Sequence, residues 1–139
     1  MIIVVVLAAV GGAVGVVAWL RRTYVVVTVA GSSMLPAYRP GDRVLVRRGR
    51  VDRVARRQVA VFAPGPHIAL TDGSGLLVKR VVAVAGDAHE GVVVPEGCLV
   101  VLGDNPEGSL DSRVFGYVTA EHFLGTVVRT LKGAVHGLG

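Results

Sequence analysis

The sequence predicts a mainly β protein: a compact antiparallel β-domain that carries one N-terminal transmembrane helix. One observation is the stretch from Ile2 to Leu20, which contains no charged residue. The other is a series of short Val-rich segments separated by turn residues, with no strong helical period outside the first stretch. Apolar residues make up 52% of the 139-residue chain. This share is high for a soluble domain and agrees with a membrane segment.

The uncharged stretch is long enough to cross a bilayer. A helix of this length spans roughly 28 Å at about 1.5 Å per residue, close to the thickness of the hydrocarbon layer. Trp19 lies where an interfacial aromatic residue is expected, and Arg21-Arg22 closes the segment. We predict that residues 1–22 form a retained anchor. The alternative, a cleavable signal peptide, would have a basic region before the apolar stretch.

The remaining chain, residues 23–139, is predicted to form the β-domain. A turn is expected at Ala63–His67, and one helical turn is expected at Glu121–Leu124. The predicted strands are Tyr24–Val29, Arg43–Arg47, Gln58–Phe62, Leu76–Ala85 (one bent strand or a pair), Cys98–Leu102 and Gly125–Thr130.

The charge of the chain is carried mainly by arginine. The net charge is +5, and 13 of the 15 basic residues are Arg, with a run between Arg39 and Arg57. This run is either a solvated face or a surface attracted to membrane lipid with anionic headgroups. No aromatic residues interleave with the arginines, so a nucleic-acid partner is not expected. The single cysteine, Cys98, excludes a disulfide within the chain and is predicted to be a small core residue.

Three segments stand apart from the apolar background. In the first, Gly31-Ser-Ser-Met-Leu-Pro36 follows a predicted strand, where a tight loop can present a hydroxyl and backbone N–H groups to one point, as acyl transfer requires. In the second, Lys79 lies within an apolar strand of a chain whose basic residues are nearly all Arg. A buried lysine can lose its proton and act as a base, which arginine cannot do.

The third segment is the loop from Gly103 to Gly116. It collects Asp104, Asn105, Ser109, Asp111, Ser112 and Arg113 between two predicted strands. Taken alone, each segment also has a purely structural explanation: a turn, a surface lysine whose aliphatic stem covers apolar surface, and an Asx-rich loop.

In this order the three segments resemble the type I signal peptidase family, the Ser-Lys membrane proteases of peptidase family S26. Gly31-Ser-Ser-Met-Leu-Pro36 is similar to the nucleophile segment, and Lys79-Arg-Val-Val-Ala-Val-Ala-Gly-Asp87 to the lysine segment. Gly103-Asp-Asn-x3-Ser-x-Asp-Ser-Arg-x2-Gly116 matches the third segment at each defining position. The resemblance covers almost the whole chain.

The resemblance implies a role for each residue of the site. Ser33 would be the nucleophile, with its backbone N–H as one oxyanion donor, and Lys79 the general base. Ser109 would hydrogen-bond and orient the Lys79 amine. The supporting residues would be Asp111 paired with Arg113, Asp104 near Arg80, and Met34 packed beside the catalytic pair. No metal or cofactor is implied.

The resemblance also implies a substrate and a location. The substrates would be precursor proteins with signal or leader peptides, cut after small residues, and the domain would face the outside of the plasma membrane. The pair Arg21-Arg22 argues the reverse, because basic residues favour the cytoplasmic side. Gly31 also departs from family members that place a serine hydroxyl there as second oxyanion donor.

Four alternatives remain open. A dedicated maturation protease of the same family would trim one leader peptide. A non-catalytic membrane-anchored β-module would bind without cleaving. A repressor-type self-cleaving protein would need a DNA-binding domain and a cleavable linker, and neither is visible. A Ser-His-Asp triad would need one of the four histidines, which lie outside the three segments: His67, His89, His122 and His136.

Overall fold

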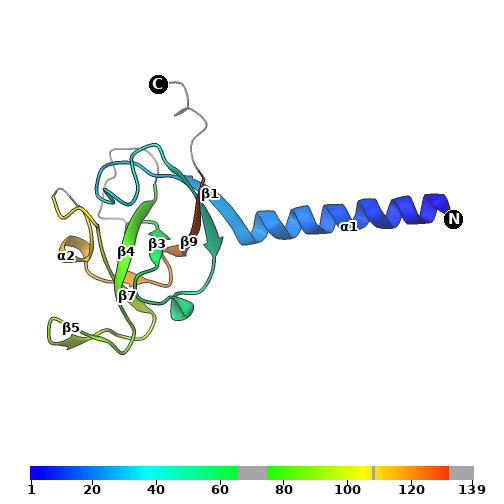
Figure 1. The fold of residues 1–139 in the computed structure, drawn as a ribbon. Helices are drawn as coiled ribbons and strands as arrows, with labels where there is room; N and C mark the ends of the chain where they lie inside the picture. Colours follow the sequence, from blue (N-terminus) through cyan, green and yellow to red (C-terminus); the bar gives the residue numbers. More distant parts are fainter. Residues whose placement is uncertain (66–74, 108, 132–139) are drawn as a thin grey trace, which may run out of the picture.

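The N-terminal element is a long apolar helix that projects from the rest of the chain (Figure 1). This computed structural model describes residues 1–65, 75–107 and 109–131. Helix α1 runs from Ile2 to Thr23, and none of its residues is buried. Its 22 residues are long and apolar enough to cross a membrane. The helix therefore fits a membrane-anchored protein.

The rest of the described chain is built on one antiparallel sheet of seven strands. Their order is β1-β2-β9-β3-β4-β7-β8, which leaves β1 and β8 at the edges. The strands are β1 (Tyr24–Thr28), β2 (Arg43–Arg48), β3 (Val59–Phe62), β4 (Leu77–Val84), β7 (Cys98–Leu102), β8 (Val118–Thr119) and β9 (Phe123–Leu131).

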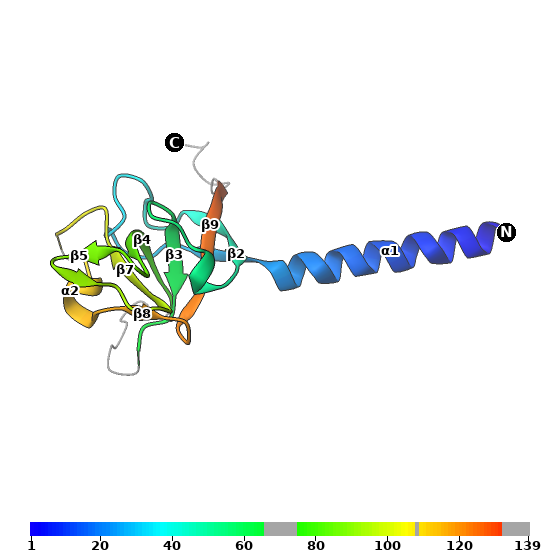
Figure 2. The ribbon, with the colours of Figure 1, turned by 90° about the horizontal axis from the view of Figure 1, so that it is seen from below.

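Three smaller elements extend from this sheet. Strands β5 (Ala88–His89) and β6 (Val92–Val93) form a separate hairpin, which lies at the end of the domain far from α1 (Figure 2). The short helices are η1 (Val51–Arg53) and α2 (Ser112–Phe115).

The sheet is curled, and the curl decides where the site forms. In a flat sheet β1 and β4 would lie roughly 19 Å apart, four strand spacings of about 4.8 Å. Register shifts interrupt the pairing of β2, β3 and β4, and such bulges bend strands and increase their twist. At Gly125 of β9, an added Cβ would collide with the carbonyl oxygen of Arg47, so only glycine permits β2 and β9 to approach this closely.

Both faces of the sheet are covered by apolar side chains. All four residues of β3 are buried, because alternate residues point into different clusters. The first cluster contains Val27, Val29, Met34, Val44, Val46, Val59, Val61 and Val78. The second contains Val54, Ala60, Phe62, Leu77, Val81, Leu99, Val101 and Val118. The central strands β3 and β4 are therefore shielded from water on both sides.

The structure confirms the predicted fold class and six strands, with ends shifted by a few residues. Leu77–Val84 is one strand with an irregularity between Val81 and Ala83, so the bent-strand alternative is the correct one. The helical turn predicted at Glu121–Leu124 is wrong, because Phe123 begins β9. The predicted turn at Ala63–His67 lies partly outside the described residues. Cys98, predicted in the core, is partly buried against the small cluster around Val94.

Candidate active site

Ser33 lies on a loop that is closed by backbone hydrogen bonds. Just beyond the end of edge strand β1, Val29 N donates to Asp42 O and Gly41 N donates to Val29 O, both at 2.8 Å. These bonds hold both ends of the loop together. Within it, Gly31 has a φ of 73°, a conformation that glycine adopts without steric cost. The loop thus turns sharply just before the serine pair.

Met34 anchors the loop to the core. Its side chain is 1% exposed and belongs to the cluster that contains Val78, the residue before Lys79. Ser33 remains partly accessible, whereas Ser32 is exposed. Burial of the neighbouring methionine therefore fixes the loop against the sheet.

Lys79 reaches Ser33 from the middle of the sheet. In the pleat of β4 it shares a face with Leu77 and Val81, both buried, and its own exposure is 3%. Its Nζ hydrogen-bonds Oγ of Ser33. The structure therefore brings together the two residues for which the resemblance implies the roles of nucleophile and base.

The surroundings of Lys79 favour its neutral form. Burial lowers the pKa of the Lys79 amine, and the negative charge of Asp111 raises it in part. The net shift is downward from the ordinary value. A buried amine has lost the water that stabilises its charged form, so it becomes a usable base nearer neutral pH.

Asp111 is the fully buried acid of the site, with 0% exposure. Arg113 donates two charge-assisted hydrogen bonds to it, Nε to Oδ1 at 3.0 Å and Nη2 to Oδ2 at 2.8 Å. Gly103 N and Ser109 Oγ also donate to Oδ2, at 3.0 and 2.8 Å. Burial raises the pKa of the Asp111 carboxyl, but these bonds together hold that pKa well below its usual range.

Ser109 lies in the site with a different partner from the one expected. Its hydroxyl donates to Asp111, and within the described ranges it forms no hydrogen bond to Lys79. The hydroxyl thus supports the acid that raises the pKa of Lys79, while direct orientation of the amine by Ser109 stays a prediction.

Asp104 also accepts a bidentate pair of hydrogen bonds from an arginine, as Asp111 does. Arg80, the residue after Lys79, donates Nε to Oδ1 and Nη2 to Oδ2 of Asp104, both at 2.8 Å. The same guanidinium donates Nη1 to the carbonyl of Arg57 at 2.8 Å. This bidentate pair ties the start of the Gly103–Gly116 loop to β4 next to Lys79. The resemblance had implied only that Asp104 lies near Arg80.

Asn105 bonds the backbone of both Ser32 and Ser33, a contact that the sequence did not predict. Its backbone N–H donates to the carbonyl of Ser33 at 2.7 Å, and its side-chain Nδ2 donates to the carbonyl of Ser32 at 3.1 Å. The Ser32 carbonyl and the Ser33 N–H belong to one rigid peptide plane and point in opposite directions. Fixing the carbonyl therefore fixes the N–H, which has no acceptor in the part of the chain that the structure describes.

Gly103 allows its loop to lie against the loop that carries Ser33. A Cβ at this position would collide with Oγ of Ser109 and would lie 2.7 Å from the carbonyl oxygen of Ser33. The glycine is thus required by space. The sequence shows that Gly103 opens the polar segment, but only the structure shows that it approaches Ser109 and Ser33.

Other candidate groups lie outside this cluster. His89 belongs to β5 and His122 to the turn before β9, and neither bonds Ser33 or Lys79. His67 and His136 lie outside the described residues. Among the residues that are described, no three His, Cys, Asp or Glu side chains gather closely enough to hold a metal ion.

A serine hydroxyl bonded to a buried lysine of lowered pKa has the geometry to act as a nucleophile with a base beside it. The chain matches the family model described as signal peptidase, peptidase S26, over residues 2–90 and 88–131. It therefore belongs to the S26 family. One similar protein, the probable signal peptidase I-2 of Synechocystis sp., is 26% identical over 126 residues, covering 70% of this chain and 58% of that protein. The chain thus spans under two thirds of that relative's length.

Proposed function

We propose that the protein is a membrane-anchored serine endopeptidase that removes signal or leader peptides from precursor proteins. Residues 1–22 would be its anchor and residues 23–139 its catalytic domain. The observation that carries the proposal is the hydrogen bond between Lys79 Nζ and Ser33 Oγ in a buried setting. Membership of the S26 family supports the substrate class.

The first half of the reaction makes an acyl-enzyme. Neutral Lys79 takes the proton of the Ser33 hydroxyl as Oγ attacks the scissile carbonyl. The negative oxygen that forms is stabilised by the backbone N–H of Ser33, a contribution of about 3–4 kcal/mol per donor. Lys79, now protonated, gives its proton to the leaving amine, and the C–N bond breaks.

The second half repeats the chemistry with water. Lys79 is neutral again and removes a proton from water, which attacks the ester carbonyl. The Ser33 oxygen leaves and regains its proton from Lys79. Asp111 stabilises the ammonium form in both halves, because its charge raises the pKa of Lys79. Arg113 and Ser109 keep this carboxylate ionised and in place. No metal or cofactor is needed.

The test compares two adjacent serines. Full-length protein in detergent or vesicles is incubated with candidate precursors that carry small residues before the cut. Ser33→Ala is expected to abolish cleavage, whereas Ser32→Ala, the matched neighbour with an exposed side chain, retains it. Equal loss in both variants, or cleavage that persists in Ser33→Ala, would contradict the assignment of the nucleophile.

A dedicated maturation protease for one leader peptide is the second candidate. The pair Arg21-Arg22 in the last turn of α1 favours it, because basic residues after an anchor favour a cytoplasmic domain. Such a domain would process substrates that are not exported. A C-terminal fusion separates the cases: alkaline phosphatase activity marks an extracytoplasmic domain, and green fluorescence marks a cytoplasmic one. A wild-type protein that cuts no precursor would instead favour a binding module.

A further inference from the structure

A cavity of about 380 Å³ lies apart from the Ser33–Lys79 site and shares no residue with it. Four arginines line it, from the end of β2 and the segment that follows: Arg47, Arg48, Arg50 and Arg53. Gln58 and Thr126 add polar groups to the lining. The cavity is large enough for a small polar ligand.

The cavity is positively charged: four arginines line it, and no Asp or Glu among the described residues does. Arg50 pairs with Asp52 at 3.2 Å, with both side chains more than half exposed. In the described part of the chain, no carboxylate pairs with Arg47, Arg48 or Arg53. Clefts lined by one sign of charge concentrate counter-ions, so the expected ligand is an anion.

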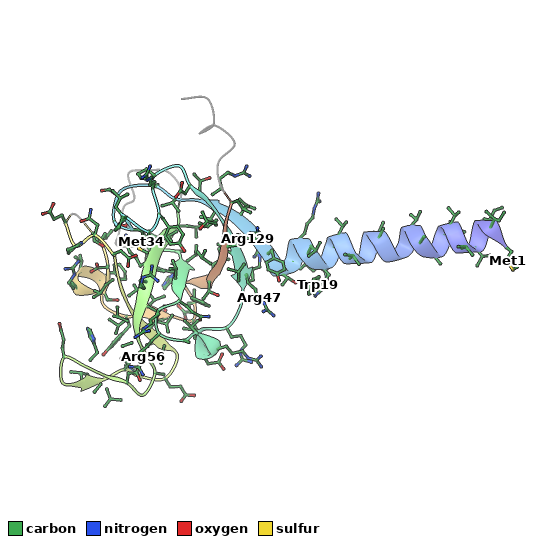
Figure 3. All side chains as sticks on the ribbon, viewed as in Figure 1. Met1, Trp19, Met34, Arg47, Arg56 and Arg129 are labelled. Carbon is green, nitrogen blue, oxygen red and sulfur yellow. The ribbon has the colours of Figure 1, made fainter. Side chains whose placement is uncertain are left out.

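The cavity lies at the membrane end of the domain. Arg47 pairs with Tyr24 in the register of β1 and β2, and Tyr24 directly follows α1. Neighbouring strands are about 4.8 Å apart, so Arg47 is one strand spacing from the point where the chain leaves the helix. The rings of Trp19 and Tyr24 pack edge to face with their centroids 6.3 Å apart, and Trp and Tyr are enriched at membrane interfaces. Figure 3 shows Arg47 at this junction.

The polar groups suit a phosphate. Guanidinium groups match phosphate oxygens with paired hydrogen bonds and are held less strongly by water than ammonium groups. The Oε1 atom of Gln58 accepts the N–H of Ala55 at 2.9 Å, which leaves the amide NH2 as a further donor. The lining therefore offers several donors and little that would repel an anion.

We propose that this cavity binds the phosphate of an anionic phospholipid headgroup beside the anchor. The position next to α1 favours a lipid over a free phosphate, because headgroups are concentrated at that level of the chain. The inference rests on the anchor role of α1 in the proposed function and does not depend on peptide cleavage. Its consequence is a second attachment of the domain to the membrane surface, which limits how the domain tilts about α1.

The full chain contains a reporter at this place, because Trp19 is its single tryptophan. The protein is reconstituted in lipid nanodiscs, and quenching of Trp19 fluorescence by brominated phosphatidylglycerol is compared with quenching by brominated phosphatidylcholine at equal mole fraction. Stronger quenching by phosphatidylglycerol is expected. A basic residue near the surface contributes on the order of fivefold to binding of anionic lipid, so Arg47→Gln/Arg48→Gln/Arg53→Gln is expected to remove most of the preference.

A matched variant removes the same charge elsewhere. Arg39→Gln/Arg43→Gln/Arg56→Gln alters three arginines that do not line the cavity, and Arg56 lies away from α1 (Figure 3). This variant is expected to keep the preference. If the triple cavity variant fails to fold, Arg48→Gln and Arg53→Gln alone are each expected to weaken the preference.

Three outcomes would overturn the proposal: equal quenching by the two lipids in the wild type, equal loss in the cavity and control variants, or abolition of the preference by soluble glycerophosphate at matched ionic strength. The last would indicate a site for free phosphate. Ser33→Ala is expected to keep the preference, since it leaves the cavity intact. Failure of the lipid site and failure of the protease assignment are therefore distinguishable.

Discussion

Lys79 Nζ hydrogen-bonds Ser33 Oγ across 46 residues of sequence. Lys79 belongs to the central strand β4, whereas Ser33 lies on the loop after edge strand β1. The contact therefore depends on the curl of the sheet and on Met34, which fixes the loop in the core. The same burial that shields β4 lowers the pKa of the lysine. Burial of β4 therefore both stabilises the sheet and lowers the pKa of Lys79.

Replacing the base while keeping its charge tests the role of Lys79. Lys79→Arg is expected to lower kcat/KM for a precursor by about 10²- to 10⁴-fold, because arginine stays protonated and cannot accept the serine proton. Ser33→Ala/Lys79→Ala is expected to be no worse than either single variant, since the two groups act as a unit. Additive losses in the double variant would show that the residues act separately.

The pH dependence of cleavage follows from the lowered pKa of Lys79. Activity is expected to rise with pH as the amine loses its proton, with a midpoint below the ordinary lysine value of about 10.4. Asp111→Asn removes a charge that raises this pKa, so the rising limb is expected to move to lower pH. A pH profile of kcat/KM measures both effects. A limb at or above the ordinary lysine value would contradict the role of burial.

The stability of the domain is expected to depend on Asp111. Because its folded pKa is depressed, the carboxylate adds stability above its unfolded pKa of about 3.9, and that stability is lost as pH falls toward the folded value. Asp111→Asn is expected to reduce the free energy of unfolding by roughly 2 kcal/mol at neutral pH, and the difference from wild type narrows in acid. Urea unfolding in detergent measures this.

The control for that experiment is an exposed aspartate. Asp52 pairs with Arg50 in a solvent-exposed bridge, so Asp52→Asn is expected to change stability by less than about 1 kcal/mol. If both variants lose the same stability, burial of Asp111 is not the reason for its effect.

The sequence predicted the long strands of the fold better than its short elements. β7 is a continuous apolar run, and β4 is apolar apart from Lys79 and Arg80, as expected of buried strands. Helix α2 escaped prediction because it has only four residues. It begins where Asp111 caps it by accepting the N–H of Arg113 at 3.2 Å. The hairpin β5–β6 has two residues in each strand, too few to show an alternating pattern.

The candidate site was predictable as a set of residues but not as a set of contacts. Ser33, Lys79 and the Gly103–Gly116 loop stand out by residue type and by resemblance. Spacing in the sequence, however, cannot show that Ser109 bonds Asp111, or that Asn105 bonds the carbonyls of Ser32 and Ser33. These contacts depend on how two loops meet over a curled sheet, which is tertiary information.

Gly103 offers a test of the close approach between the two loops. Gly103→Ala is expected to cost about 1–3 kcal/mol of stability and most of the activity, because its Cβ would displace Ser109 or the Ser33 carbonyl. Gly49→Ala is the matched control, since no atom lies within 4 Å of its added Cβ. Thermal unfolding and precursor cleavage are measured together. An active, stable Gly103→Ala would show that the loops can separate without loss.

Asn105 tests the proposed role of the Ser33 N–H as an oxyanion donor. Its Nδ2 and the N–H of Leu35 hold the Ser32 carbonyl and so aim the Ser33 N–H, while the backbone bond of Asn105 to Ser33 survives any substitution but proline. Asn105→Ala is expected to lower kcat by roughly tenfold, about 1.4 kcal/mol, with KM nearly unchanged, because the donor acts on the transition state. Asn105→Asp keeps the acceptor for the N–H of Glu107 but loses the donor, so it is expected to match Asn105→Ala. Steady-state kinetics with one precursor compare the three proteins. Full activity in Asn105→Asp would show that the bond to Glu107 matters and the bond to Ser32 does not.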